Sequence, residues 1–198
     1  HKEYRRQRQM CIRDRLLTQN VDGLHEAAGS RATIDLHGRI DTVRCMGCER
    51  RMPRAELQRE LRARNPRWAA LEARAAPDGD ADLEGHDFSA FDVPACAHCG
   101  GLLKPDVVFF GESVPRKRVA AAFAALDAAD AVLVAGSSLM VYSGFRFVQA
   151  AAAAGKPVAA VNLGRTRADE LLALKVERPV GEALAALAQA LAPEPRAA

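Results

Sequence analysis

The chain has 198 residues, of which 49% are hydrophobic and 27% charged, and its formal net charge is +3. This is enough apolar sequence for one good core and a small additional module, which excludes a disordered or low-complexity protein. Residues 1–15 hold six Lys or Arg against two acids, so the rest of the chain is close to neutral and no nucleic-acid binding through a basic face is expected. No apolar run approaches the roughly 20 residues needed to cross a bilayer, so no membrane partner is expected either.

The first predicted element is a short strand at Leu16 and Leu17. The polar, turn-forming residues 18–23 follow it, at the kind of strand end where catalytic and binding groups often lie. Taken alone, these residues favour an ordinary Asx-type turn beside an incidental histidine, His25.

Four of the five cysteines form two Cys-x-x-Cys pairs: Cys45 with Cys48, and Cys96 with Cys99. Without a signal-peptide hydrophobic region, this spacing favours a metal site over disulfides and a reducing compartment, the cytoplasm or, in a eukaryote, the mitochondrial matrix. Four thiolates complete a tetrahedral zinc shell with no open position, so the predicted zinc ion is structural. His98 lies inside the second pair and is expected to point outward. Cys11 receives no role.

Residues 39–104 are charged and rich in turns, and they predict a small zinc-binding domain. The 47 residues between the two cysteine pairs exceed the zinc-ribbon spacing of roughly 15 to 20, so they must fold as a lobe of their own. Residues 54–64 predict a polar helix, and residues 76–80 predict an exposed turn.

After Pro105 the pattern alternates between strands and helices. Strands are predicted at 107–110 (buried), 131–135, 157–161 and near 176–179, and helices at 116–129, 145–154 and 181–191. This order predicts an α/β fold: a doubly wound, mostly parallel, Rossmann-like sheet formed by residues 16–38 and 105–192, with 193–198 as a disordered tail. In such sheets ligands bind beyond the carboxyl ends of the strands, where residues 136–138 and 162–164 fall. Ordinary loops rich in Gly, Ser and Asn would show the same pattern.

Several motifs in one order resemble the sirtuin family. They are Thr-Gln-Asn-Val-Asp-Gly-Leu-His from Thr18, His37-Gly38, the two cysteine pairs, Lys-Pro-Asp-Val-Val-Phe-Phe-Gly-Glu from Lys104, and Gly136-Ser-Ser. The resemblance covers residues 16–191. Asn-Pro-Arg-Trp from Asn65 and Val-Tyr-Ser-Gly from Val141 are most similar to the mitochondrial-type subclass and its bacterial relatives.

The resemblance implies an NAD-dependent protein-lysine deacylase (deacetylase). In that reaction NAD loses nicotinamide, the acyl-lysine oxygen takes its place at the ribose carbon, and a ribose hydroxyl attacks the resulting imidate to give O-acyl-ADP-ribose. His37 matches the family's catalytic base, a task that suits imidazole. His25 is then structural.

The resemblance also implies the NAD contacts and the substrate contacts. Gln19, Asn20 and Asp22 would meet the nicotinamide riboside, and Gly136, Ser137 and Ser138 the phosphate and ribose region. Asn162, Leu163 and Gly164 would meet the adenosine side, and Val180 the adenine. The backbone of a protein substrate would add as a strand between Val108, Phe110 and Gly111 on one side and the segment after Ser138 on the other, with its acylated lysine in an apolar tunnel. Core packing is the alternative for Val108 and Phe110.

Residues 1–15 stand where a sirtuin carries its first strand and its glycine-rich cofactor loop. No Gly-x-Gly-x-x-Gly occurs in the sequence. We therefore expect an N-terminally truncated sirtuin with a foreign extension at 1–15 and impaired catalysis. Two alternatives stay open at this point: a mono-ADP-ribosyltransferase and an inert, zinc-stabilised binding module.

Overall fold

The computed structural model describes residues 15–71, 74–75, 81–82 and 87–191. The chain divides into two compact units, which are described separately. The parallel-sheet unit contains the described residues up to Gln19, residues 30–36 and those from Ser113 onward, and the cysteine unit contains residues 20–29 and 37–112. The domain bounds predicted from sequence, 16–38 with 105–192 and 39–104, assign residues 20–29 and 105–112 differently. They stay a prediction, because compactness alone does not define a domain.

Short parallel strands build the first unit. Strand β1 (Leu16–Thr18) pairs with β2 (Thr33–Asp35). Strands β8 (Val132–Ala135), β9 (Val158–Val161) and β10 (Leu174–Val176) form a second parallel sheet with the order β10-β9-β8. Val158, Ala160 and Val161 of the central strand are all buried, as expected for a strand that is paired on both edges.

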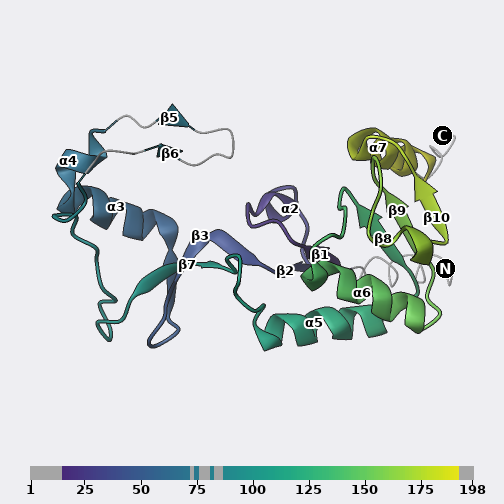
Figure 1. Ribbon diagram of the computed structural model, residues 1–198, viewed down its shortest axis with the longest axis horizontal. Helices are drawn as coiled ribbons and strands as arrows, with labels where there is room; N and C mark the ends of the chain where they lie inside the picture. The colour runs from purple at the N-terminus through teal and green to yellow at the C-terminus, as the bar shows by residue number, and fades with distance from the viewer. Residues whose placement is uncertain (1–14, 72–73, 76–80, 83–86, 192–198) are drawn as a thin grey trace, which may run out of the picture. The chain divides into compact units, whose positions relative to one another are not determined.

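Three helices cover this second sheet. Figure 1 shows α7 (Val180–Ala190) on one side of β8–β10, and α5 (Arg116–Asp127) and α6 (Tyr142–Ala153) on the other. A short 3-10 helix, η1 (Asp169–Leu171), precedes β10. Helix α6 buries one face, which includes Phe145, Phe147 and Val148, and the Phe147 ring lies 4.9 Å from that of Phe123 on α5. The predicted α/β fold with parallel sheets is confirmed.

The cysteine unit is built on an antiparallel sheet. Strand β3 (Gly38–Cys45) lies between β4 (Arg51–Pro53) and β7 (Leu103–Val107). The other elements are α2 (Leu24–Ala27), α3 (Arg54–Arg64), α4 (Pro66–Ala69), β5 (Arg74–Ala75) and β6 (Ala81–Asp82). Helix α3 confirms the predicted polar helix with the same bounds.

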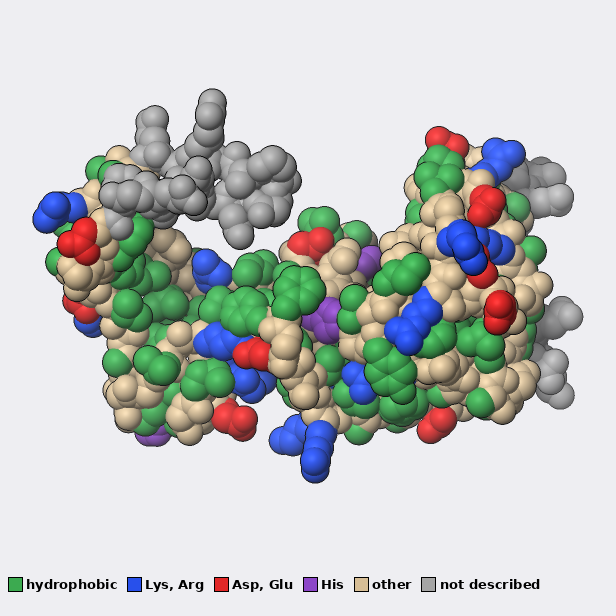
Figure 2. Space-filling view, viewed as in Figure 1, with side chains coloured by type: hydrophobic (Ala, Val, Ile, Leu, Met, Phe, Trp, Pro, Cys, Tyr) green, Lys and Arg blue, Asp and Glu red, His purple; other side chains and the backbone are tan. Residues whose placement is uncertain are grey.

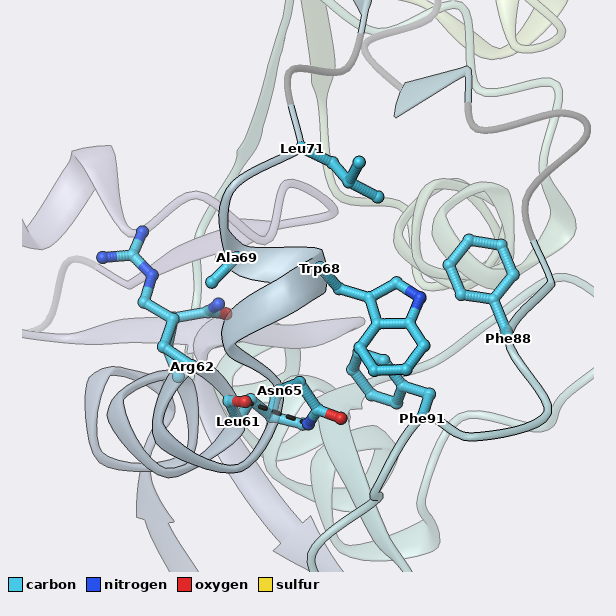
Figure 3. A pocket seen from close by; sticks show the side chains of 9 residues that line it. Leu61, Arg62, Asn65, Trp68, Ala69, Leu71, Phe88 and Phe91 are labelled. Carbon is cyan, nitrogen blue, oxygen red and sulfur yellow. Dashed lines mark hydrogen bonds between the residues drawn. The ribbon is translucent and has the colours of Figure 1, made fainter.

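Asn65 joins α3 and α4 to the segment before the second cysteine pair. Its side chain is almost fully buried, donates to the carbonyls of Leu61 (2.9 Å) and Asp92 (2.8 Å), and accepts from the Asp92 amide (2.7 Å). Trp68 packs edge-on against Phe91, with ring centroids 5.4 Å apart, and both line a shallow pocket (Figure 3). The Asn-Pro-Arg-Trp motif therefore stabilises the packing of this unit.

Two strand predictions need correction. The predicted buried strand at 107–110 is wrong, because β7 ends at Val107 and Phe110 is fully exposed. The strand begins earlier and runs through Pro105, which an edge strand such as β7 tolerates. The strand predicted near 176–179 instead ends at Val176, where its ladder with β9 ends. The other predicted strands and helices of the parallel-sheet unit agree with the structure to within three residues.

Some predictions lie outside the described residues: the extension at 1–14, Cys11, the exposed turn at 76–80 and the tail at 193–198. In the part of the chain that the structure describes, no helix is long and apolar enough to span a membrane.

Candidate functional site

The four paired cysteines meet at one point of the cysteine unit. Their sulfur atoms all lie within 4.8 Å of one another, with Cys45 to Cys99 at 3.4 Å and Cys48 to Cys96 at 3.8 Å. Tetrahedral zinc with Zn–S bonds of about 2.3 Å places its sulfur ligands about 3.8 Å apart, so the cluster is positioned for a zinc ion. His98 is exposed and lies outside the cluster, as predicted.

The groups around the four thiols favour the binding of a cation between them. Hydrogen bonds from the backbone amides of Cys48 and Gly47 lower the pKa of the Cys45 thiol to about 6. The Gly101 amide acts in the same direction on Cys99, but the Cys45 and Cys48 sulfurs outweigh it and raise the pKa of Cys99 to about 12. Four clustered thiolates repel one another unless a cation neutralises them. A side chain at Gly101 would place its Cβ 3.0 Å from the Cys45 sulfur, so glycine at this position leaves room for the four sulfur atoms.

In the parallel-sheet unit, two segments far apart in sequence meet at strand ends. Gln19 follows β1 and Ser137 follows β8, and the Ser137 hydroxyl donates to the Gln19 side-chain carbonyl at 3.3 Å. The same hydroxyl accepts from the Leu139 amide at 3.2 Å. Residues predicted to bind two different parts of NAD are therefore in direct contact.

Gly144 has a packing role beside Gln19 that was not predicted from the sequence. A Cβ at this residue of α6 would lie 2.8 Å from the Gln19 carboxamide, so the missing side chain makes room for Gln19 against the helix. The sequence does contain one indication of this role. A glycine inside a helix lowers the stability of the helix, so its presence usually means that a neighbouring group needs the space.

Other predicted NAD residues also lie at carboxyl ends of parallel strands. Gly136 follows β8, has φ +62°, and donates its amide to the Val161 carbonyl. A Cβ there would touch Val180 at 3.4 Å, so the structure brings these two residues together at the start of α7. Asn162 follows β9 and is buried, with its side chain donating to the Leu163 carbonyl at 2.8 Å. Ser138, Leu163 and Gly164 are exposed.

His37 lies in the cysteine unit, directly before β3. It is half-buried, and its backbone carbonyl accepts a hydrogen bond from the Val108 amide at 2.8 Å. Gly38, which follows it, has φ +87°, a value that favours glycine, so the chain can turn sharply between His37 and the strand.

Asn20 and Asp22 are exposed on the loop that leads to α2. The Asp22 carboxylate accepts from the Leu24 amide at 3.0 Å, and the Val21 carbonyl accepts from Ile40 of β3 at 2.9 Å. Arg39, two residues after His37, forms ion pairs with Glu26 on α2 and with Asp41. These contacts fasten the loop to β3.

The predicted substrate residues follow β7. Val108 is half-buried, whereas Phe110 and Gly111 are exposed, so core packing does not explain Phe110. The turn is held by Glu112, which accepts from Lys104 (2.5 Å) and from the Phe109 amide (2.9 Å), and these bonds lower the pKa of Glu112. Figure 2 shows hydrophobic side chains on the surface over β3 and β7, where Ile40, Leu102, Phe109 and Phe110 are exposed.

Sequence comparison identifies close relatives. The chain is 69% identical over 172 residues to an NAD-dependent protein deacetylase of Bordetella bronchiseptica, covering 87% of this chain and 63% of the relative. It is 72% identical over 174 residues to an NAD-dependent protein deacetylase of Xanthomonas campestris, covering 88% of this chain and 59% of the relative. The chain thus spans about three fifths of the length of these curated relatives.

Structure comparison points the same way. A solved structure described as "Sir2 bound to acetylated peptide" superposes with a TM-score of 0.69 at 26% identity, covering 89% of this chain and 63% of the other. The profile of the Sir2 family matches residues 1–143, more than two thirds of the sequence. With its parallel sheets, its four clustered cysteines and this match, the chain belongs to the Sir2 family.

Proposed function

We propose that the protein is an NAD-dependent protein-lysine deacylase, with deacetylation as its first activity to test. The observation that carries the proposal is the Gln19–Ser137 hydrogen bond, which joins two predicted NAD segments at the carboxyl ends of parallel strands. The names of the Bordetella and Xanthomonas relatives support it. No observation favours ADP-ribosyl transfer or an inert binding module.

The reaction gives each of the predicted site residues a role. NAD would be bound by Gln19, Asn20, Asp22, Gly136, Ser137, Ser138, Asn162, Leu163, Gly164 and Val180. NAD supplies the ribose carbon that accepts the acyl oxygen when nicotinamide leaves. His37 would take the proton from the ribose hydroxyl, and Val108, Phe110 and Gly111 would contact the acyl-lysine peptide. The zinc ion would stabilise the cysteine unit without taking part in the reaction.

The direct test combines the protein with NAD and an acetyl-lysine peptide. We expect deacetylated peptide, nicotinamide and O-acetyl-ADP-ribose in equal amounts by mass spectrometry, and no turnover when NAD is omitted. Radiolabel from NAD that accumulates on protein, without acyl-ADP-ribose, would instead identify an ADP-ribosyltransferase. Folded, zinc-containing protein without any NAD-dependent turnover would identify a binding module.

The substitution Gly144→Ala tests whether the position of the Gln19 side chain matters for NAD binding. The new methyl group forces the Gln19 carboxamide to move, and the loss of one hydrogen bond of about 1 kcal/mol predicts roughly fivefold weaker NAD binding by calorimetric titration. Gly181→Ala on α7 is the control, because nothing lies within 4 Å of its Cβ and NAD affinity should stay within about twofold. Equal NAD affinities in both variants would remove Gln19 from the NAD site.

We further propose that the partners are acylated lysines of proteins and that the protein works in the cytoplasm. The related structure with acetylated peptide supports the first point. Four free, clustered thiols support the second, because such a site needs a reducing compartment.

A further inference from the structure

The segment 138–142 of the parallel-sheet unit holds an unfavourable backbone conformation. Leu139 has φ +56°, in the left-handed region that disfavours residues with a side chain, and it is only 6% exposed. Such a conformation persists only where neighbouring groups hold it from several sides, and it occurs most often at functional sites. Its neighbours Met140, Val141 and Tyr142 are more than half exposed.

Arg167 supplies contacts on both sides of Leu139. Its backbone amide donates to the Ser138 carbonyl at 2.9 Å, and its guanidinium donates to the Met140 carbonyl at 3.0 Å. The guanidinium also lies 4.5 Å from the ring centroid of Phe145 and 5.9 Å from that of Tyr142. One residue therefore links the loop after β8 to the first turn of α6.

The turn that carries Arg167 is itself fixed. Thr166 and Ala168, on either side, are buried. The Thr166 hydroxyl donates to Asp169 at 2.6 Å, and Lys175 of β10 donates to the same carboxylate at 2.9 Å. These bonds lower the pKa of Asp169 to about 2, so the carboxylate stays charged and the turn stays anchored to the sheet at neutral pH.

We propose that Arg167 is a positioning residue for the acyl-lysine peptide: it holds the backbone of 138–142 in the strained form that receives the substrate strand. The inference rests on the proposed function, since that function makes the segment after Ser138 one edge of the peptide site. The two ends of the segment depend on Arg167 differently. Ser138 is held by a backbone hydrogen bond that any residue except proline keeps, whereas Met140 is held by the guanidinium. Loss of the side chain should therefore impair peptide binding and spare NAD binding.

Arg167→Met tests this in steady-state kinetics with the acyl-lysine peptide, because Met keeps an apolar stem and removes every donor. We expect the KM for peptide to rise about tenfold, with the KM for NAD and kcat at saturating peptide within about twofold. Arg167→Lys keeps a cation over Phe145 and one donor, so it should recover most of the loss. Arg165→Met is the matched control: Arg165 is an exposed neighbour without a partner among the described residues, and its loss should leave all constants within about twofold.

Hydrogen exchange supplies a readout that does not depend on catalysis. In Arg167→Met without ligands, the amides of 139–142 should exchange at least about fivefold faster, and those of β8 and β9 at unchanged rates. If the protein shows no deacylase activity, the proposed function fails and this exchange still decides whether Arg167 holds the segment. Unchanged exchange at 139–142, an equal increase in Arg165→Met, or an equal rise in the KM for peptide and for NAD would each overturn the inference.

Discussion

Replacement of Cys96 by serine is expected to remove bound zinc and to unfold the cysteine unit. Cys96 is 9% exposed and its sulfur lies 3.8 Å from that of Cys48, so the serine leaves three thiols around a gap. Structural zinc contributes on the order of 10 kcal/mol to the folding of small zinc modules. We expect one zinc ion per chain in the parent and close to none in the variant, with a melting temperature at least about 10 °C lower. A strong chelator should produce the same shift in the parent.

Cys11→Ser is the matched control for this experiment, since Cys11 belongs to neither cysteine pair. It should retain both the zinc content and the melting curve of the parent. Elemental analysis and calorimetry on the same samples separate loss of metal from loss of fold. A Cys96→Ser protein with full zinc content and an unchanged melting curve would contradict a structural zinc site.

Sequence patterns predicted what depends on local spacing. The helix at 54–64 has its predicted bounds, and β8, β9, α5, α6 and α7 lie within three residues of theirs. The five elements of the parallel-sheet unit combine an apolar pattern with Gly, Pro or polar residues at their ends. The four cysteines were predictable for the same reason, because a pair of thiols two residues apart carries its own chemistry.

What the sequence did not predict depends on contacts between distant residues. Pro105 suggested that a strand begins after it, but the pairing of β7 with β3 sets the register, and proline is acceptable on an edge. Gly144 and Arg167 act on Gln19 and Met140, which are 125 and 27 positions away, and no local pattern indicates such pairs. Leu139 is likewise a typical apolar residue in the sequence. Only its φ reveals the strain.

Replacement of His37 by tyrosine is expected to abolish turnover while leaving both substrates bound. As the proposed base, His37 contributes roughly 10² to 10⁴ in rate and little to ground-state affinity. The fold should survive, because the hydrogen bond from the Val108 amide goes to the backbone carbonyl of His37, which tyrosine also provides. We expect kcat for the acetyl-lysine peptide to fall at least about 100-fold, with the dissociation constants of NAD and peptide within about threefold.

His25→Gln separates this role from that of the nearest histidine in sequence. His25 lies on α2, in the loop region that Arg39 and Glu26 fasten to β3, so its substitution should reduce stability slightly and leave kcat within about threefold. The pH profile of kcat/KM adds an independent measurement, since a histidine base gives a rising limb near its ordinary pKa of about 6.5. That limb should disappear with the residual activity of His37→Tyr. Near-normal turnover in His37→Tyr together with a strong loss in His25→Gln would transfer the base to His25, and near-normal turnover in both would leave the reaction without a histidine base.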